Sequence, residues 1–255
     1  LIAPFNDADF AAGVIDEYGD EIAGVIVEPL QRLIPPTLGF LETLRAKTTE
    51  RGIVLIFDEV VTGFRLAWGG AQEQYGVVPD LCTLGKIIGG GLPLAAIAGR
   101  ECIMRHFDEK AVGEAGFTFQ IGTLSGNPLA AVAGLATLDV LDRPGSYERL
   151  TEVGIRLMTA ADEALDAVGI PHQIVGDPTL FDVIFSANPV LNYRDIMAAD
   201  SQRAAIFNGA LRSRGILKAG AKTYPHLALN EADILQTIDA YGYAAGQVAA
   251  MPAAS

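Results

Sequence analysis

Two uninterrupted apolar segments, separated by a helical pattern, restrict the fold of this chain more than any other feature of its sequence. Residues 23–27 and 53–57 read Ala-Gly-Val-Ile-Val and Ile-Val-Leu-Ile-Phe. Short apolar runs without alternating polar residues are typical of strands that are covered on both faces. Between them, residues 39–49 have apolar side chains at helical spacing, and Gly52 is a helix stop. Strand, helix and strand in this order predict a parallel βαβ unit and therefore an α/β fold.

A break in the helical pattern divides the sequence into two predicted domains. The segment Arg143-Pro144-Gly145-Ser146 interrupts an apolar helix that opens at Asn127-Pro128. We therefore expect residues 1–143 to form one domain, which contains the parallel sheet. We expect residues 144–255 to form a smaller α+β domain.

The remaining helices and strands are predicted from caps, apolar spacing and glycine stops. In the first domain we expect a helix over Asp7–Tyr18, capped by Asn6 or Asp7, and a helix from Pro128 to about Leu141. In the second domain we expect a helix capped by Ser146 and ending near Gly169, strands at His172–Val175 and Leu180–Phe185, a helix over Arg194–Arg214, and a last helix capped by Asn230.

The composition is that of a folded chain and argues against several classes of partner. Half of the 255 residues are hydrophobic and 19% are charged, which is too apolar for intrinsic disorder. Eighteen basic against 31 acidic residues give a net charge of −13, so nucleic acid and anionic membranes are not expected partners. No apolar stretch reaches the roughly 18 residues of a membrane span. Two cysteines and no zinc-type histidine spacing predict a cytoplasmic protein with neither a disulfide framework nor a metal site.

Asp58 is the first residue with a candidate chemical role. It directly follows the apolar run at 53–57, so its carboxylate belongs at the carboxyl edge of the parallel sheet. Ligands bind at that edge in open α/β folds. A carboxylate there is stable beside a cation or a protonated ligand nitrogen. On position alone, however, an acidic cap or loop residue is the simpler interpretation.

Lys86 lies among apolar residues and glycines, in the segment Leu84-Gly85-Lys86-Ile87-Ile88-Gly89-Gly90-Gly91. Apolar surroundings lower the pKa of a lysine and free a nucleophilic amine, and glycines let the backbone approach a ligand closely. A surface lysine on an ordinary turn is the alternative. The segment does not fit a nucleotide-binding P-loop, because Ile87 stands where Ser or Thr is required.

The segment Gly122-Thr123-Leu124-Ser125-Gly126-Asn127-Pro128 is a third candidate. A loop of glycine and hydroxyl residues that leads into a helix N-terminus favours anion binding through amides, hydroxyls and the helix dipole. Many capped helices look similar, so the segment is weak by itself. Together, the three features match pyridoxal phosphate (PLP), which needs a lysine for its aldehyde, an acid for its ring nitrogen and an anion site for its phosphate.

With these features the sequence resembles the class-III (subgroup III) PLP-dependent aminotransferases, and most of all their glutamate-1-semialdehyde aminomutase branch. The segments that carry the resemblance, in family order and spacing, are Val27-Glu28-Pro29, residues 57–65, residues 79–93 and residues 122–128. The resemblance implies fold type I, the aspartate aminotransferase-like fold. It implies part of a large PLP-binding domain with a mainly parallel sheet, followed by a C-terminal α+β small domain.

The resemblance also implies a role for each matched residue. Lys86 would form a Schiff base with the cofactor and later move a proton, and Asp58 would pair with the ring nitrogen. Val60 would pack on one face of the ring. Gly122 and Thr123 would bind the phosphate, in this family usually that of the neighbouring subunit, which implies a homodimer with shared active sites.

Four further residues are candidates from the same resemblance. Glu28 would lie close to the cofactor. Gln31 and Arg32 follow it and are candidates for contact with a substrate carboxylate, although a surface loop would have the same sequence. His226 is a candidate substrate contact, and a loop histidine without a catalytic part is its alternative.

Two departures from the family bear on function. Family members carry a long N-terminal portion with further cofactor contacts, whereas the segment Leu1–Asp7 resembles an internal family segment, so we expect this chain to be a C-terminal portion. Aminomutases also carry a gating glutamate in a stretch that corresponds to Gly220–His226. Here that stretch contains Ala221 in its place, and Leu229 stands where many relatives have histidine.

These features favour a PLP-dependent aminotransferase that moves an amino group between an α- or β-amino acid and a keto acid. The alternatives that keep the cofactor are a glutamate-1-semialdehyde-type 2,1-aminomutase and a racemase. A third alternative is a non-catalytic fragment that retains the fold for assembly. The atypical start supports that alternative, and the presence of Asp58, Lys86 and Thr123 opposes it.

Overall fold

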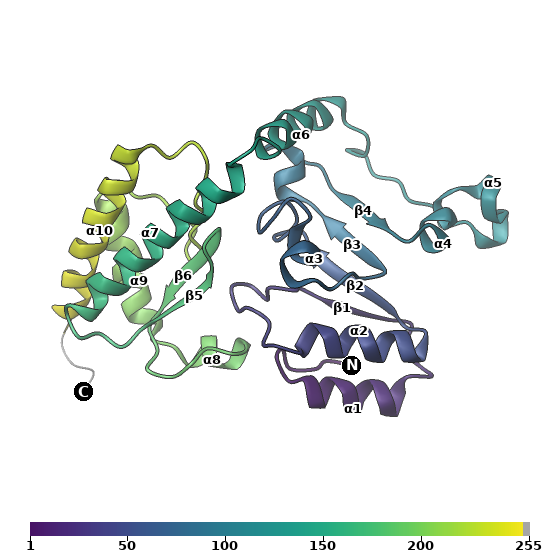
Figure 1. Cartoon of the computed structure of the whole chain (residues 1–255), viewed down its shortest axis with the longest axis horizontal. Helices are drawn as coiled ribbons and strands as arrows, with labels where there is room; N and C mark the ends of the chain where they lie inside the picture. Colours follow the sequence, from purple (N-terminus) through teal and green to yellow (C-terminus); the bar gives the residue numbers. More distant parts are fainter. Residues whose placement is uncertain (252–255) are drawn as a thin grey trace. The chain divides into compact units, whose positions relative to one another are not determined.

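The computed structural model describes residues 1–251, which divide into two compact units (Figure 1). The first, called the sheet unit here, comprises residues 1–3, 7–31 and 38–144. The second, called the C-terminal unit, comprises residues 4–6, residues 32–37 and the chain from Gly145 onward. Two short segments near the N-terminus therefore belong to the C-terminal unit.

The sheet unit is built on a four-stranded sheet of order β1-β2-β3-β4 (Figure 1). Its strands are β1 (Gly24–Val27), β2 (Val54–Glu59), β3 (Leu81–Leu84) and β4 (Ala96–Gly99). β1 pairs with β2 and β2 with β3 in parallel, while β4 runs antiparallel to β3. The predicted βαβ unit and mainly parallel sheet are therefore confirmed. β2 extends two residues beyond the predicted run and includes both Asp58 and Glu59.

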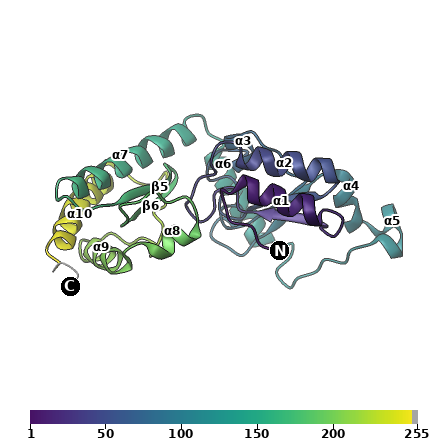
Figure 2. The same ribbon diagram turned by 90° about the horizontal axis from the view of Figure 1, so that it is seen from below.

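The helices of the sheet unit begin and end at the residues that local chemistry favours. They are α1 (Ala8–Tyr18), α2 (Phe40–Arg51), α3 (Gly70–Tyr75), α4 (Glu101–Met104), α5 (Glu109–Val112) and α6 (Pro128–Leu141), with 3₁₀ turns at Lys86–Gly89, Arg105–Phe107 and Glu114–Gly116. Asp7 caps α1 and Asn127 caps α6 through their side chains, and Gly52 ends α2 in a left-handed conformation. α1 and α2 lie side by side (Figure 2) and are joined by an ion pair between Lys47 and Asp16 at 2.8 Å.

Two apolar strand residues form the centre of the sheet-unit core. Leu55 and Phe57 are fully buried on β2, and Leu41 and Leu44 of α2 are buried as well. Burial of one such side chain stabilises a fold by about 1.5–3 kcal/mol. β2 is thereby fixed between its neighbours, and its carboxyl end has a defined position.

The C-terminal unit packs three long helices against a two-stranded antiparallel sheet. Its elements are α7 (Ser146–Asp166), β5 (Gln173–Asp177), β6 (Leu180–Ile184), α8 (Tyr193–Ala198), α9 (Ser201–Ser213) and α10 (Glu231–Ala249). Phe207 of α9 stacks on Tyr241 of α10 and meets Phe185 edge-on. The predicted α+β organisation of this part is confirmed.

Two local predictions are wrong. Gly145 at φ +86°, rather than Ser146, is the N-cap of α7, and Ser146 is the first helical residue. The single helix expected over 194–214 is two helices, because Ala199 is extended and Asp200 caps α9 by accepting from the amides of Gln202 and Arg203. An Asp that can accept two free amides competes with helix continuation.

Among residues 1–251, no helix combines the length and the apolar character that crossing a membrane requires.

Candidate functional site

Asp58 lies one residue before the carboxyl end of β2, partly buried and opposite Thr83 of β3 in the parallel register. Its Oδ1 accepts hydrogen bonds from the Val60 amide at 3.1 Å and from the Thr83 hydroxyl at 3.3 Å. Within residues 1–251, its Oδ2 accepts no hydrogen bond and meets no cation. The carboxylate is therefore held by one oxygen and available through the other.

Glu59, next to Asp58, is a buried carboxylate whose oxygens are both occupied. Its Oε2 accepts from the Ala71 amide at 2.6 Å and from the Thr62 hydroxyl at 3.2 Å, and its Oε1 accepts from Gln72 at 2.8 Å. A buried acid with both oxygens bonded needs no ligand to be stable. An unbonded carboxylate oxygen is therefore specific to Asp58 and is not found in its neighbour Glu59.

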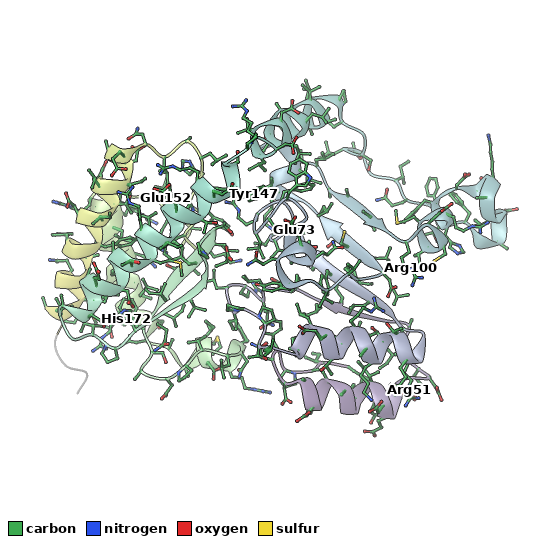
Figure 3. All side chains as sticks on the ribbon, viewed as in Figure 1. Arg51, Glu73, Arg100, Tyr147, Glu152 and His172 are labelled. Carbon is green, nitrogen blue, oxygen red and sulfur yellow. The ribbon has the colours of Figure 1, made fainter. Side chains whose placement is uncertain are left out.

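Asp80, at the start of β3, also differs from Asp58 because both of its oxygens are bonded within the chain. It accepts from the Leu55 amide at 2.8 Å and forms ion pairs with Arg45 and Arg100, each at 3.0 Å. Arg100 follows β4 (Figure 3). Burial by itself raises the pKa of Asp80, but the Leu55 amide and the two guanidinium groups outweigh burial and lower it. Asp80 is therefore a structural carboxylate.

Lys86 is the second residue after β3 and begins the 3₁₀ turn Lys86–Gly89. Its φ is +51°, a left-handed conformation that is uncommon outside glycine. The side chain is exposed, and its ammonium has no hydrogen bond or ion pair within the described chain. The apolar enclosure expected from the sequence is thus not present in this structure, because the neighbouring Ile88 turns into the core while Lys86 turns outward.

One of the glycines that follow Lys86, Gly90, lies in close contact with α6. A Cβ on Gly90 would overlap the Ala133 carbonyl of α6, and a Cβ on Gly134 would overlap the Ile88 carbonyl. The 3₁₀ turn and α6 therefore pack backbone against backbone, which only glycine permits. A Cβ on Gly85 would lie 3.3 Å from the Val60 side chain, so Val60 covers the backbone directly before Lys86.

Thr123 lies in the turn that leads into α6, as the sequence predicts. Its side chain is exposed and its hydroxyl has no partner within residues 1–251. The first amides of α6 are not free, since Leu129 and Ala130 both donate to Asn127 Oδ1. An anion at this loop would therefore meet hydroxyl groups and the amides of the turn, and not the first amides of the helix.

A cavity of about 900 Å³ connects two of the predicted segments. Val60 and Thr83, the partners of Asp58, line one part of it, and Gly122 and Ser125 line another. The remaining lining is mostly apolar and comes from Leu84, residues 93–97, Met104, Phe107, residues 117–120, Leu124 and Gly126. The structure thus brings the Val60 and Gly122 segments to one hollow, although more than 60 residues separate them in the chain.

The weaker candidates lie in both units. Glu28 directly follows β1, at the same sheet edge as Asp58. Gln31 is partly buried, and its Oε1 is buried without a hydrogen-bond partner among the described residues. Arg32 and His226 are exposed and belong to the C-terminal unit. The roles of these four residues stay predictions.

Sequence reasoning missed Thr83, which orients Asp58 from the neighbouring strand. A sequence signal existed, because Thr83 is a polar residue inside a short strand and lies three residues before Lys86. Phe117 and Phe119, which line the cavity, were also missed. They lie in a segment without helix or strand, where no periodic pattern marks a buried face.

The model of the family "Aminotransferase class-III" matches residues 7–239. Glutamate-1-semialdehyde 2,1-aminomutase 2 of Brevibacillus brevis is 42% identical over 94% of this chain and 56% of its own length. Glutamate-1-semialdehyde 2,1-aminomutase of Thermomicrobium roseum is 41% identical over 98% of this chain and 58% of its own length. This chain therefore spans somewhat more than half the length of these relatives.

Solved structures agree with the sequence matches. An omega-transaminase from Sphaerobacter thermophilus superimposes with a TM-score of 0.89 at 34% identity, over 97% of this chain and 57% of its own. A β-phenylalanine aminotransferase from Variovorax paradoxus gives a TM-score of 0.85 at 32% identity, over 95% and 56%. Since the family model covers most of its length, this chain belongs to the class-III aminotransferases, a family that depends on pyridoxal phosphate.

Proposed function

We propose that the full-length protein binds PLP at the carboxyl edge of the sheet and moves an amino group within one substrate, in the manner of a glutamate-1-semialdehyde 2,1-aminomutase. One observation carries the cofactor site: Asp58 Oδ2, the Lys86 ammonium and the Thr123 hydroxyl all lack partners within residues 1–251. The two aminomutases at 42% and 41% identity favour this reaction over transfer between two substrates.

The residues at this edge fit PLP in their chemistry. PLP supplies an aldehyde that binds amino groups and a ring that accepts electrons. Asp58 Oδ2 holds a proton at the ring nitrogen, while its Oδ1 stays bonded to Val60 and Thr83. The amine of Lys86 binds the aldehyde and then moves a proton at the reacting carbon. Val60 covers one face of the ring, and Thr123 donates to the phosphate.

The same assignment extends to a homodimer with shared sites. Thr123 is exposed beside Ile121 and Leu124, which expose 74% and 54% of their surface. Exposed apolar residues next to an unpartnered hydroxyl suit a surface that closes over a second subunit. Sedimentation of the full-length protein as a monomer with PLP bound would contradict this assembly.

A single assay separates transfer within one substrate from transfer between two. The purified full-length protein, loaded with PLP or its amino form, is given glutamate-1-semialdehyde without a keto acid. An aminomutase returns the isomer with the amino group on C1 over many turnovers. An obligatory aminotransferase loaded with PLP stops after one equivalent and resumes when a keto acid is added, and that result would overturn the proposal.

Transfer of an amino group between an amino acid and a keto acid is the second candidate function. The sequence of residues 220–226, which differs from the aminomutase pattern, supports it. Ala221 lies where the aminomutase pattern has a gating glutamate, and two solved relatives above 30% identity are transaminases. The PLP-loaded protein would then accept amino donors only together with a keto acid. β-Amino acids belong in the same screen, because one of those relatives is a β-phenylalanine aminotransferase.

Lys86→Ala tests the cofactor assignment independently of the substrate. The side chain is exposed and unpartnered, so we expect the variant to fold normally. It should lack the visible absorption band that the Schiff base gives in the wild type. After borohydride reduction the wild type should keep PLP covalently attached on denaturation, whereas the variant should release it. Equilibrium dialysis of the full-length protein with PLP tests the non-catalytic alternative, which predicts no binding.

A further inference from the structure

We infer that Glu59 is a positioning residue for the cofactor site: it anchors the turn whose first amide orients Asp58. The buried Glu59 carboxylate ties three donors to the end of β2. This inference rests on the proposed PLP site. It adds a residue that faces away from that site and acts through the backbone.

The contacts of Glu59 lie near both ends of the segment formed by residues 60–71. Glu59 is 1% exposed, and its side chain accepts from Thr62, three residues on, and from Ala71 and Gln72, twelve and thirteen residues on. Its backbone carbonyl also accepts from the Gly63 amide at 2.9 Å. Both ends of the segment 60–71 are therefore fixed to the same residue of β2.

That segment carries the groups that define the site around Asp58. Its first amide, from Val60, donates to Asp58 Oδ1, and the Val60 side chain lines the cavity and packs against Gly85. A displacement of the segment would move both groups together. The free oxygen of Asp58 would then point in a different direction, with no change in Asp58 itself.

The packing around Glu59 leaves it little freedom to move. A Cβ on Gly70 would overlap Glu59 Oε2, and Gly70 has φ +66°, so a larger residue fits poorly there. The polar donors to Glu59 in the described chain are a hydroxyl, a backbone amide and a side-chain amide, all neutral. Hydrogen bonds, and not an ion pair, therefore hold the segment in place.

Asp80 provides a matched control on the same sheet. It too is a buried carboxylate with several donors, but it bonds the Leu55 amide at the amino-terminal part of β2, whereas Glu59 is the last residue of β2. Loss of Asp80 should lower stability without reorienting Asp58. Comparison of the two sites separates positioning from a general loss of stability.

The test uses the full-length protein with PLP and the variants Glu59→Leu, Glu59→Gln and Asp80→Asn. Glu59→Leu removes all three acceptor contacts at similar volume, so we expect the Kd for PLP to rise about tenfold or more, as for one misaligned charged hydrogen bond. The visible spectrum of the bound cofactor should also change its pH dependence. Glu59→Gln keeps acceptor bonds to Thr62 and Ala71 if Gln72 turns its amide, so its Kd should stay within about twofold of wild type.

The control Asp80→Asn and the milder variant Thr62→Val distinguish a positioning role of Glu59 from a general loss of stability. Asp80→Asn should lower the unfolding free energy and leave the Kd and spectrum unchanged. If Glu59→Leu does not fold, Thr62→Val removes one of the three donors at equal shape and should raise the Kd by a smaller factor. The inference is overturned if folded Glu59→Leu or Thr62→Val binds PLP as the wild type does, or if Asp80→Asn raises the Kd equally. A wild type that binds no PLP refutes the proposed function instead.

Discussion

Lys86 shows at the scale of one residue how a functional group can oppose local stability. A side chain with a Cβ at φ +51° is strained relative to glycine, and within residues 1–251 the Lys86 side chain has no hydrogen bond or ion pair to offset the strain. Gly90, which ends the same turn, is a glycine that the close packing on α6 requires. Packing within the described chain does not account for a lysine at this position, whereas the cofactor site proposed above does.

A pair of variants measures this strain. Lys86→Gly relaxes the left-handed backbone, whereas Lys86→Ala keeps the Cβ that causes it. We expect the glycine variant to have an unfolding free energy about 1 kcal/mol above that of the alanine variant, measured by urea unfolding. Equal stability of the two variants would show that the backbone at residue 86 carries no strain. Both variants should lose covalent PLP binding.

Three carboxylates of the sheet also differ at this scale in how many of their oxygens are hydrogen-bonded within the chain. This difference distinguishes a candidate ligand-binding acid from acids that stabilise the fold. Glu59 and Asp80 have both oxygens bonded within the chain, whereas Asp58 has one oxygen bonded and one free. Their sequences alone do not distinguish them, because each is an acid beside an apolar run. Their hydrogen bonds do, since buried acids without a ligand role are normally satisfied internally.

At the scale of elements, helix ends were predicted best where a side chain forms the cap itself. Asn230 caps α10 in a reciprocal arrangement: its Oδ1 accepts from the Asp233 amide at 3.1 Å, and Asp233 accepts from the Asn230 amide at 3.0 Å. This pairing depends on residues three apart and is visible in the sequence. Gly145 caps α7 by its backbone conformation, without a side-chain hydrogen bond. No side-chain signal therefore distinguishes it from Ser146, the N-cap that the sequence predicts.

The cap of α10 has a measurable contribution. Asn230→Ala leaves the Asp233 amide without its acceptor, so we expect a loss of about 1 kcal/mol in unfolding free energy. Asn230→Ser keeps an acceptor and should lose much less. Urea unfolding of both variants, followed by circular dichroism, checks the difference. An alanine variant as stable as wild type would mean that solvent satisfies this helix end equally well.

At the scale of the whole molecule, Asp80 connects elements that are far apart in the chain. It joins the start of β3 to β2 through Leu55, to α2 through Arg45 and to the end of β4 through Arg100. The pKa of Asp80 lies below its ordinary value, since these donors outweigh the effect of burial. A lowered pKa stabilises the fold above the unfolded-state value, and this contribution is lost as the pH falls through the folded-state value.

The stability of the sheet unit should therefore depend on acid through Asp80. We expect Asp80→Asn to lower the unfolding free energy by about 2 kcal/mol at neutral pH. The difference from wild type should begin to shrink as the pH falls below about 4, where Asp80 becomes protonated in the unfolded chain, and should continue to shrink until the pH passes the lowered pKa of the folded state. Urea unfolding of both proteins over a pH series measures this. A difference that is constant down to acid pH would show that the charge of Asp80 makes no contribution.

The sequence by itself determined the parallel βαβ unit, several helix ends and the three segments around Asp58, Lys86 and Thr123. Each of these properties depends on residues that are contiguous in the chain, because apolar runs, caps and short motifs are local patterns. Only the tertiary structure decided that Asp58 is held by Thr83 of the next strand, that Lys86 faces outward, and that Glu59 is bonded to the start of α3. Such contacts depend on strand register and burial, which arise from the packing of residues far apart in the chain. A local pattern can mark Thr83 as a polar strand residue, but it does not identify the partner of that residue.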